Sequence, residues 1–197
     1  MNKHLDAGPV FKEHYATLKT ISLDDSRKER NYMLPSEMVA VNFDAVKNAY
    51  IKEMSLTEAP SSSDALLEPI DGEYCFIEFK NGHVNGKEAY GIRKKIYDSL
   101  LIFNDIMNVT VSFCRENMDF ILVYNEQRNS DIREDEVVES CESSPSRIVI
   151  SNYFSKKAKQ PFIRFGLEKF KTIYFRNVFT YTPNEFEKEY LTRSENV

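Results

Sequence analysis

The sequence of 197 residues has no tryptophan, few glycines and only three cysteines. Because Cys75, Cys114 and Cys141 are odd in number and widely spaced, they indicate neither a disulfide framework nor a zinc ribbon. The chain has no run of about 20 apolar residues, and charges interrupt its opening segment, so we expect neither a membrane span nor a secretory signal. P-loop and dinucleotide-binding glycine patterns are also missing. These absences favour a cytoplasmic protein.

The composition is that of one compact domain with an uneven distribution of charge. With 42% hydrophobic residues, a chain of 197 residues can bury one sizeable core but has little room for two. Residues 131–142 contain six acidic side chains and one arginine, whereas residues 147–176 contain eight lysines and arginines and one glutamate. We interpret the acidic segment as a surface loop. The basic segment is either a phosphate-binding surface or a solvated helix or hairpin face.

Hydrophobic periodicity predicts a mixture of helices and strands. Helical spacing begins after Pro35 and again after Gly86, where Ala89, Ile92 and Ile96 start an apolar stripe. A continuous apolar run at residues 120–123 is typical of a central strand. The predicted helices cover residues 36–53, 86–103 and a short segment from 183, and the predicted strands cover residues 64–69, 73–80, 108–113, 118–124 and 172–180.

The most informative segment is a predicted hairpin that brings Asp64 near Glu78. Side chains alternate along a strand, so Glu78 and Lys80 lie on the same face. A two-residue turn over residues 71–72 would point Asp64 to the opposite face, because one residue of slip reverses a strand. A three-residue loop over residues 70–72 puts Asp64 directly opposite Glu78. We predict the three-residue loop.

Two carboxylates and a lysine on one face of a sheet suit a divalent-metal site. Carboxylates held a few ångströms apart repel one another unless a cation neutralises them, and Mg²⁺ or Mn²⁺ prefers such oxygen ligands together with water. A bound metal lowers the pKa of its water and stabilises the charge that grows on a scissile phosphate. We therefore predict that Asp64 and Glu78 bind the metal and that Lys80 orients the attacking water.

With Asp64, a hairpin, Glu78-x-Lys80 and then a helix, the sequence resembles the PD-(D/E)XK nuclease superfamily. The resemblance covers roughly residues 36–126, and it departs from the family pattern at Ser63, which stands in place of proline. It implies an α/β (mixed α+β) fold whose central mixed β-sheet is flanked by helices, a restriction-endonuclease-like core. The whole chain would then be a single nuclease-like domain with a C-terminal elaboration. The implied activity is Mg²⁺- or Mn²⁺-dependent hydrolysis of phosphodiester bonds, with Lys80 assisting the nucleophile.

The resemblance also implies an acidic residue on a helix before the first catalytic strand. Glu37 and Glu53 both lie on the helix predicted over residues 36–53. We take Glu37 as the candidate third metal ligand, although helical acids are more often solvated. The implied partner is DNA or RNA. The sequence leaves open which of the two is cut, and whether the chain acts as a monomer or as a homodimer.

Other interpretations of the same residues stay open. An E-x-K at the end of a strand is often a solvated edge, where the lysine discourages strand pairing. Asp64 after three serines is also compatible with an ordinary loop. One alternative is therefore a catalytically inactive nuclease-like module that binds nucleic acid through its basic segment. Another is a protein-interaction module, in phage defence or toxin neutralisation, whose contact surface is residues 131–142.

Overall fold

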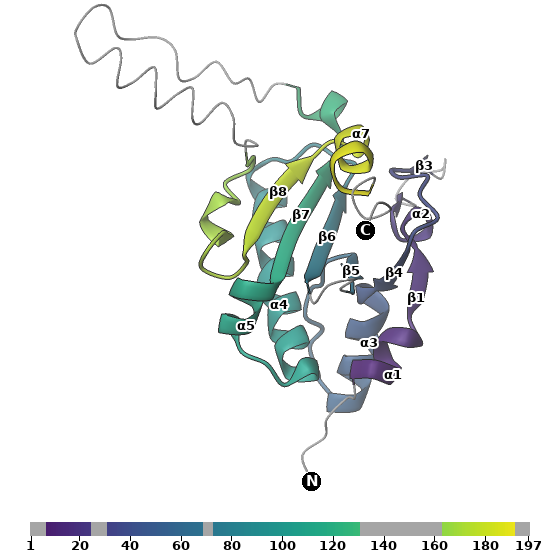
Figure 1. Ribbon diagram of the computed structural model, residues 1–197, viewed down its shortest axis with the longest axis vertical. Helices are drawn as coiled ribbons and strands as arrows, with labels where there is room; N and C mark the ends of the chain where they lie inside the picture. The colour runs from purple at the N-terminus through teal and green to yellow at the C-terminus, as the bar shows by residue number, and fades with distance from the viewer. Residues whose placement is uncertain (1–6, 25–30, 69–72, 131–162, 192–197) are drawn as a thin grey trace, which may run out of the picture.

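The computed structural model describes residues 7–24, 31–68, 73–130 and 163–191. Within these ranges the fold is mixed α/β, with a six-stranded mixed sheet flanked by helices (Figure 1). Neighbouring strands from β1 to β6 are antiparallel, whereas β6, β7 and β8 run parallel. In spatial order the strands are β1 (Tyr15–Thr17), β4 (Val39–Asn42), β5 (Ala65–Leu67), β6 (Tyr74–Lys80), β7 (Met118–Tyr124) and β8 (Asn177–Tyr181). The predicted mixed sheet between helices is confirmed.

Different elements cover the two faces of the sheet. Phe76 and Phe120 share one core with the helices α1, α3, α4 and α5, whereas Ile77 and Ile121 share the other with α2 and α7. A second sheet, β2 (Leu23–Asp24) with β3 (Asn31–Tyr32), lies beside the second core. The helices are α1 (Ala7–Lys12), α2 (Leu18–Ile21), α3 (Phe43–Met54), α4 (Gly86–Met107), α5 (Val111–Asn117) and α7 (Pro183–Phe186), with short turns η1 (Glu126–Arg128), η3 (Glu168–Phe170) and η4 (Glu187–Leu191).

Three predicted elements are confirmed. Helix α4 begins at Gly86, because the Asn85 side chain caps it by accepting hydrogen bonds from two backbone N–H groups. Every residue of β7 is buried, as expected for a parallel strand covered on both faces. Helix α7 begins at Pro183, where Thr182 and Glu185 form a capping box.

The helix predicted over residues 36–53 begins too early. Val39–Asn42 forms strand β4, and the helix starts at Phe43, where the Asn42 side chain accepts a hydrogen bond from a backbone N–H in the first turn. Ser36, the N-cap expected from the sequence, lies outside any described helix and accepts from the N–H of Met38. Pairing of β4 with β1 and β5 overrides the helical spacing of these residues.

The strand predicted over residues 108–113 is wrong. Val111–Asn117 forms helix α5, which buries Cys114 rather than alternate side chains. Three alternating apolar residues are too short a pattern to distinguish a strand from a helical turn. The strand predicted over residues 172–180 is present as β8 but starts only at Asn177.

Some predictions lie outside the described residues. These are the acidic segment 131–142, the first part of the basic segment, and the loop over residues 70–72. For the ranges that the structure does describe, no helix is long and apolar enough to cross a membrane.

Gly166→Ala is expected to lower the free energy of unfolding by about 1 to 2 kcal/mol. Gly166 has a φ of +65°, and a Cβ there would lie 2.9 Å from Nη2 of Arg93. That nitrogen donates to the carbonyl of Phe165 at 3.2 Å, so the guanidinium cannot withdraw without losing the hydrogen bond.

Gly91→Ala in α4 is the matched control, because a Cβ at Gly91 meets nothing within 4 Å. Urea denaturation should show stabilisation by up to about 1 kcal/mol for the control. Equal effects of the two changes would contradict this account.

Candidate functional site

Asp64 and Glu78, here called the acidic pair, lie opposite one another at the point where β5 begins. Ala65 pairs with Ile77 and Leu66 with Phe76, so the same register puts Asp64 beside Glu78. The backbone N–H of Asp64 donates to the carbonyl of Ile77 at 3.1 Å. This is the register that the three-residue loop predicts, and it is confirmed. Both carboxylates therefore face helix α4.

Lys95 of α4 joins the acidic pair. Its Nζ lies 3.0 Å from Oδ1 of Asp64 and 2.7 Å from Oε1 of Glu78. The other oxygen of Asp64, Oδ2, accepts a hydrogen bond from the backbone N–H of Phe79 at 2.7 Å. The Asp64 side chain is thus fixed from both sides, while one ammonium group neutralises part of the charge of two carboxylates.

Helix α4 also holds the segment that leads into Asp64. The backbone N–H of Ser61 donates to Oδ2 of Asp98 at 2.7 Å, and the N–H of Ser63 donates to Oγ of Ser99 at 2.7 Å. Ser99 and Lys95 are one turn apart on the same helix face. One face of α4 therefore positions both the acid and its ammonium partner.

Asp44 is a third carboxylate near this group. It lies in the first turn of α3, where it accepts hydrogen bonds from the hydroxyl of Ser62 and from Lys47. Burial raises the pKa of Asp44, but the bonds from Ser62 and Lys47 outweigh burial and hold it below its usual value. Its negative charge in turn raises the pKa of Asp64 and of Glu78. The group thus carries three acids around Lys95.

Glu78 is the most unusual residue of the site. Its side chain is 3% exposed, and its Oε2 is buried without a hydrogen-bond partner. Burial raises the pKa of Glu78 well above its usual range, the charge of Asp64 raises it further, and Lys95 opposes the rise. Burial likewise raises the pKa of Asp64, against Lys95 and the Phe79 N–H. Such carboxyl groups strongly favour a proton or a cation beside them.

Lys95 keeps its charge at this position. Burial lowers its pKa, but the charges of Glu78 and Asp64 outweigh burial and hold the pKa of Lys95 above its usual value. Its side chain is 32% exposed, so water still reaches the ammonium group. The arrangement can therefore present a positive donor next to two carboxylates at the surface of the protein.

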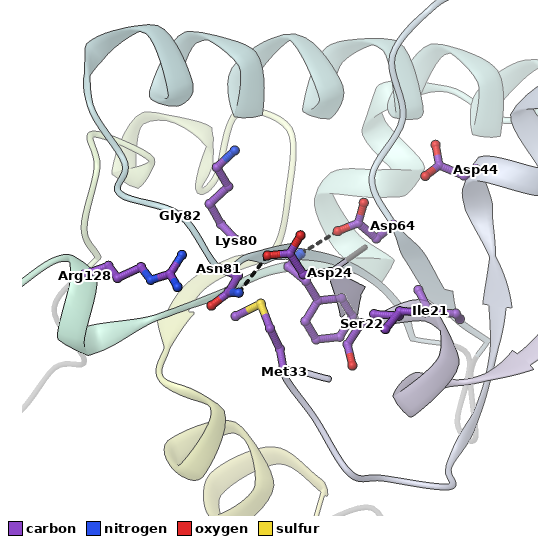
Figure 2. A pocket seen from close by; sticks show the side chains of 12 residues that line it. Ile21, Ser22, Asp24, Met33, Asp44, Asp64, Lys80, Asn81, Gly82 and Arg128 are labelled. Carbon is purple, nitrogen blue, oxygen red and sulfur yellow. Dashed lines mark hydrogen bonds between the residues drawn. The ribbon is translucent and has the colours of Figure 1, made fainter. Parts of the chain in front are cut away.

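Lys80, the lysine predicted from the motif, has a different partner. It lies on the α4 side of the sheet, as the alternation predicts, but its ammonium pairs with Glu88 in the first turn of α4. Figure 2 shows its side chain extending away from Asp64. Among the contacts of the described residues, Lys80 has none with the acidic pair. It does line the pocket next to Asp64.

Glu37, the predicted third ligand, lies elsewhere. Its carboxylate pairs with Lys19 of α2 at 2.9 Å, and its side chain is 68% exposed. Glu53, the other helical candidate, is exposed near the end of α3. In the described part of the chain, Asp44 is the helical acid whose charge acts on both members of the acidic pair.

The sequence analysis did not identify Lys95 or Asp44, although the position of each in its helix is a sequence feature that points to it. Lys95 follows buried Ile92 by three residues and precedes buried Ser99 by four, so it belongs to the stripe of α4 that faces the sheet. Asp44 comes two residues after the N-cap Asn42, a position where acids favour a helix start.

A pocket of ≈ 370 Å³, here called the first pocket, opens beside Asp64 (Figure 2). Asp44 and Asp64 lie at one end, and Arg128 lies at the other. Between them, the amide of Asn81 donates to Asp24 at 2.7 Å. A ligand of moderate size can therefore reach Asp64 from solvent.

The donor set fits a divalent cation bound through two carboxylates. Within the described ranges, no group of three or more histidine, cysteine, aspartate or glutamate side chains is arranged to hold a metal ion. Mg²⁺, however, is commonly bound through only one or two carboxylates, with water and substrate phosphates completing its shell. The unpartnered Oε2 of Glu78 next to Asp64 supplies hard oxygen ligands of this kind. Asp64 and Glu78 are thus the residues that would hold the metal.

Two arginines of the described part of the basic segment lie at different ends of the sheet. The backbone N–H of Arg164 donates to Oγ1 of Thr180, which is two strands from Glu78 in the same row, whereas Arg176 lies away from the acidic pair. Arg176 pairs with Asp119 and Glu73, and its backbone N–H donates to Met118, the first residue of β7. Glu78 lies toward the opposite end of the sheet, because β6 and β7 run parallel. Residues 147–162 lie outside the described residues.

Comparisons of this chain with protein-family models, with curated proteins and with solved structures give no match. The functional argument therefore depends on the geometry of the acidic pair, Lys95 and the first pocket.

Proposed function

We propose that this chain is a divalent-metal-dependent nuclease with a restriction-endonuclease-like core, which hydrolyses phosphodiester bonds of DNA or RNA in the cytoplasm. The observation that carries the proposal is the acidic pair: two opposed carboxylates, one of them buried with an unpartnered oxygen, beside a lysine and an open pocket. The chain order of α3, β5, β6, α4 and β7 supports it, since it matches the strand, turn, strand and helix of the motif.

The residues of the site have different roles in hydrolysis. A bound Mg²⁺ or Mn²⁺ supplies an activated water and stabilises the charge on the scissile phosphate. Asp64, fixed by the Phe79 N–H, and Glu78, buried and unable to turn to solvent, hold that cation in one place. The phosphate itself enters through the first pocket.

Two lysines compete for the role of assisting the nucleophile. Lys80 has the motif spacing, but its ammonium pairs with Glu88. Lys95 contacts both carboxylates and is partly exposed, so it can donate to a phosphate oxygen or orient a water beside the acidic pair. These contacts favour Lys95 as the assisting residue, with Lys80 at the pocket wall.

A second candidate function is a catalytically inactive module that binds nucleic acid. The observation that favours it is Lys95 itself, since an ammonium group between two carboxylates already neutralises part of their charge without a metal. This candidate predicts salt-sensitive binding without turnover.

Incubation of the purified chain with single-stranded and duplex DNA and RNA, in Mg²⁺, Mn²⁺ or EDTA, separates the two candidates. We expect cleavage with either metal and none in EDTA. Absence of cleavage of every polynucleotide under both metals would overturn the nuclease, and salt-sensitive binding in the same samples would then support the inactive module.

A further inference from the structure

A second pocket adjoins the first one. It has a volume of ≈ 240 Å³ and lies between β3 and the start of α7, and it shares Met33 and Asn81 with the first pocket. Both lie where the parallel strands end: Asn81 follows β6, Asn125 follows β7, and Thr182 follows β8. The carboxyl ends of parallel strands are the usual place for ligands in open α/β sheets.

The first pocket offers two cations to a phosphate. It is lined by Lys80, whose ammonium also pairs with Glu88, and by Arg128, together with the carboxylates of Asp24, Asp44 and Asp64. Figure 2 shows the Arg128 side chain extending toward Asn81, across the pocket from Asp64. A phosphate of a nucleic-acid backbone next to the scissile one would meet these cations.

The second pocket has the chemistry of a base site. No lysine or arginine is among the described residues that line it. Half of these lining residues carry side-chain amides, among them the exposed Gln127 and Asn184, and Glu126 adds one carboxylate. Tyr32, which is 44% exposed, adds an aromatic ring. Amides hydrogen-bond base edges and aromatic rings stack on base faces, whereas neither neutralises phosphate.

Asn81, which lines both pockets, is held by hydrogen bonds on both sides of its amide. Nδ2 of Asn125 donates to Oδ1 of Asn81 at 2.8 Å, and Nδ2 of Asn81 donates to Asp24 at 2.7 Å. These two hydrogen bonds keep the residue shared by the two pockets in one arrangement. A volume of ≈ 240 Å³ lies below the roughly 300 to 1,000 Å³ of pockets for drug-sized ligands, which suits one planar base.

We propose that the second pocket binds a single unpaired base of a nucleic-acid strand whose neighbouring phosphates lie in the first pocket. The inference rests on the proposed nuclease function and names its substrate class, single-stranded nucleic acid. A base inside a duplex cannot enter such a pocket without leaving its stack, which costs a few kcal/mol. Single strands and unpaired ends therefore bind more tightly than a blunt duplex.

Fluorescence anisotropy tests the base site without cleavage. A labelled single-stranded oligonucleotide, as DNA and as RNA, and its blunt duplex are titrated with the full chain in EDTA. Tyr32→Ala should weaken single-strand binding roughly 5- to 100-fold, because one stacked base is lost. Tyr32→Phe, which keeps the ring, should bind like wild type. Tyr90→Ala is the matched control, since Tyr90 is an exposed tyrosine of α4 that lines neither pocket.

Wild-type affinity in Tyr32→Ala, or equal affinity for duplex and single strand, would overturn the base site. Cleavage in Mn²⁺, measured in parallel, keeps this outcome separate from that of the proposed function. Metal-dependent cleavage with unchanged affinity in Tyr32→Ala would support the nuclease function and contradict the base site. Weakened binding in Tyr32→Ala without any cleavage by the wild type would support the base site and contradict the proposed nuclease function.

Discussion

Glu78→Gln is expected to abolish Mn²⁺-dependent cleavage and, in EDTA at neutral pH, to make the protein more stable. Glutamine keeps the shape of the side chain but removes the negative charge that a metal needs, so activity should fall by about 10²- to 10³-fold or more. Burial and the charge of Asp64 raise the pKa of Glu78, so its ionised form costs folding free energy. The neutral amide does not carry this cost, and Lys95 keeps Asp64 as its partner.

The pH dependence of this stability difference has a definite sign. Below about pH 4, near the ordinary pKa of glutamate, Glu78 is protonated in both the folded and the unfolded wild type. Above that pH the unfolded chain loses the proton while the folded protein keeps it, so wild-type stability falls as pH rises toward the folded pKa. The advantage of Glu78→Gln should therefore grow with pH, to a size on the order of 1 kcal/mol near pH 7.

Urea denaturation in EDTA across pH 4 to 8, together with a cleavage assay, measures both effects. Glu53→Gln is the matched control, because it makes the same chemical change at an exposed glutamate of α3. If Glu78→Gln lost stability with rising pH as the wild type does, the result would contradict the raised pKa of the buried Glu78. A variant that still cleaves would contradict its role as a metal ligand.

Lys95→Met is expected to reduce both stability and cleavage. Without the ammonium group, Asp64 loses its charged partner and the buried Glu78 holds its proton more strongly, and the loss of one partner of such a group typically costs about 3 to 5 kcal/mol. Because Lys95 is 32% exposed, water screens part of this cost, and we expect about 2 kcal/mol. Cleavage should fall by about 10²-fold if Lys95 assists the reaction.

A metal titration distinguishes a Lys95 that assists cleavage from one that only pairs with the two carboxylates. Because the ammonium competes with a cation for the same carboxylates, Lys95→Met should bind Mn²⁺ more tightly and recover stability in Mn²⁺, yet still cleave slowly. Lys94→Met is the control, since Lys94 is the exposed neighbour on the same helix. Lys80→Met should have the smaller effect. Full activity in Lys95→Met with loss of activity in Lys80→Met would reverse the assignment of the two lysines.

The register of the acidic pair was predictable because it depends on local rules. Alternation along the strands and the length of one loop decide whether Asp64 faces Glu78, and the paired residues Ala65 and Ile77 have the predicted register. The start of α4 was predictable in the same way, from Gly86 and the apolar stripe that begins at Ala89. Those two features fix one carboxylate beside the other, on the face that α4 covers.

The partners of the acidic pair were not predictable, because they depend on how helices dock. Lys95 is 31 residues from Asp64 along the chain, and only the packing of α4 on the sheet joins them. The sequence offers Glu37 and Glu53 as the helical acids, because it predicts a helix that starts at Ser36, and it does not single out Asp44. Once β4 pairs with its neighbours, the first helical turn and its acid move to Phe43 and Asp44.

Anomalous diffraction from a crystal soaked in Mn²⁺ tests the central claim most directly. The account predicts a peak between the carboxylates of Asp64 and Glu78, with Lys95 released from at least one of them. A map without such a peak at saturating Mn²⁺, with Lys95 still bound to both carboxylates, would contradict it.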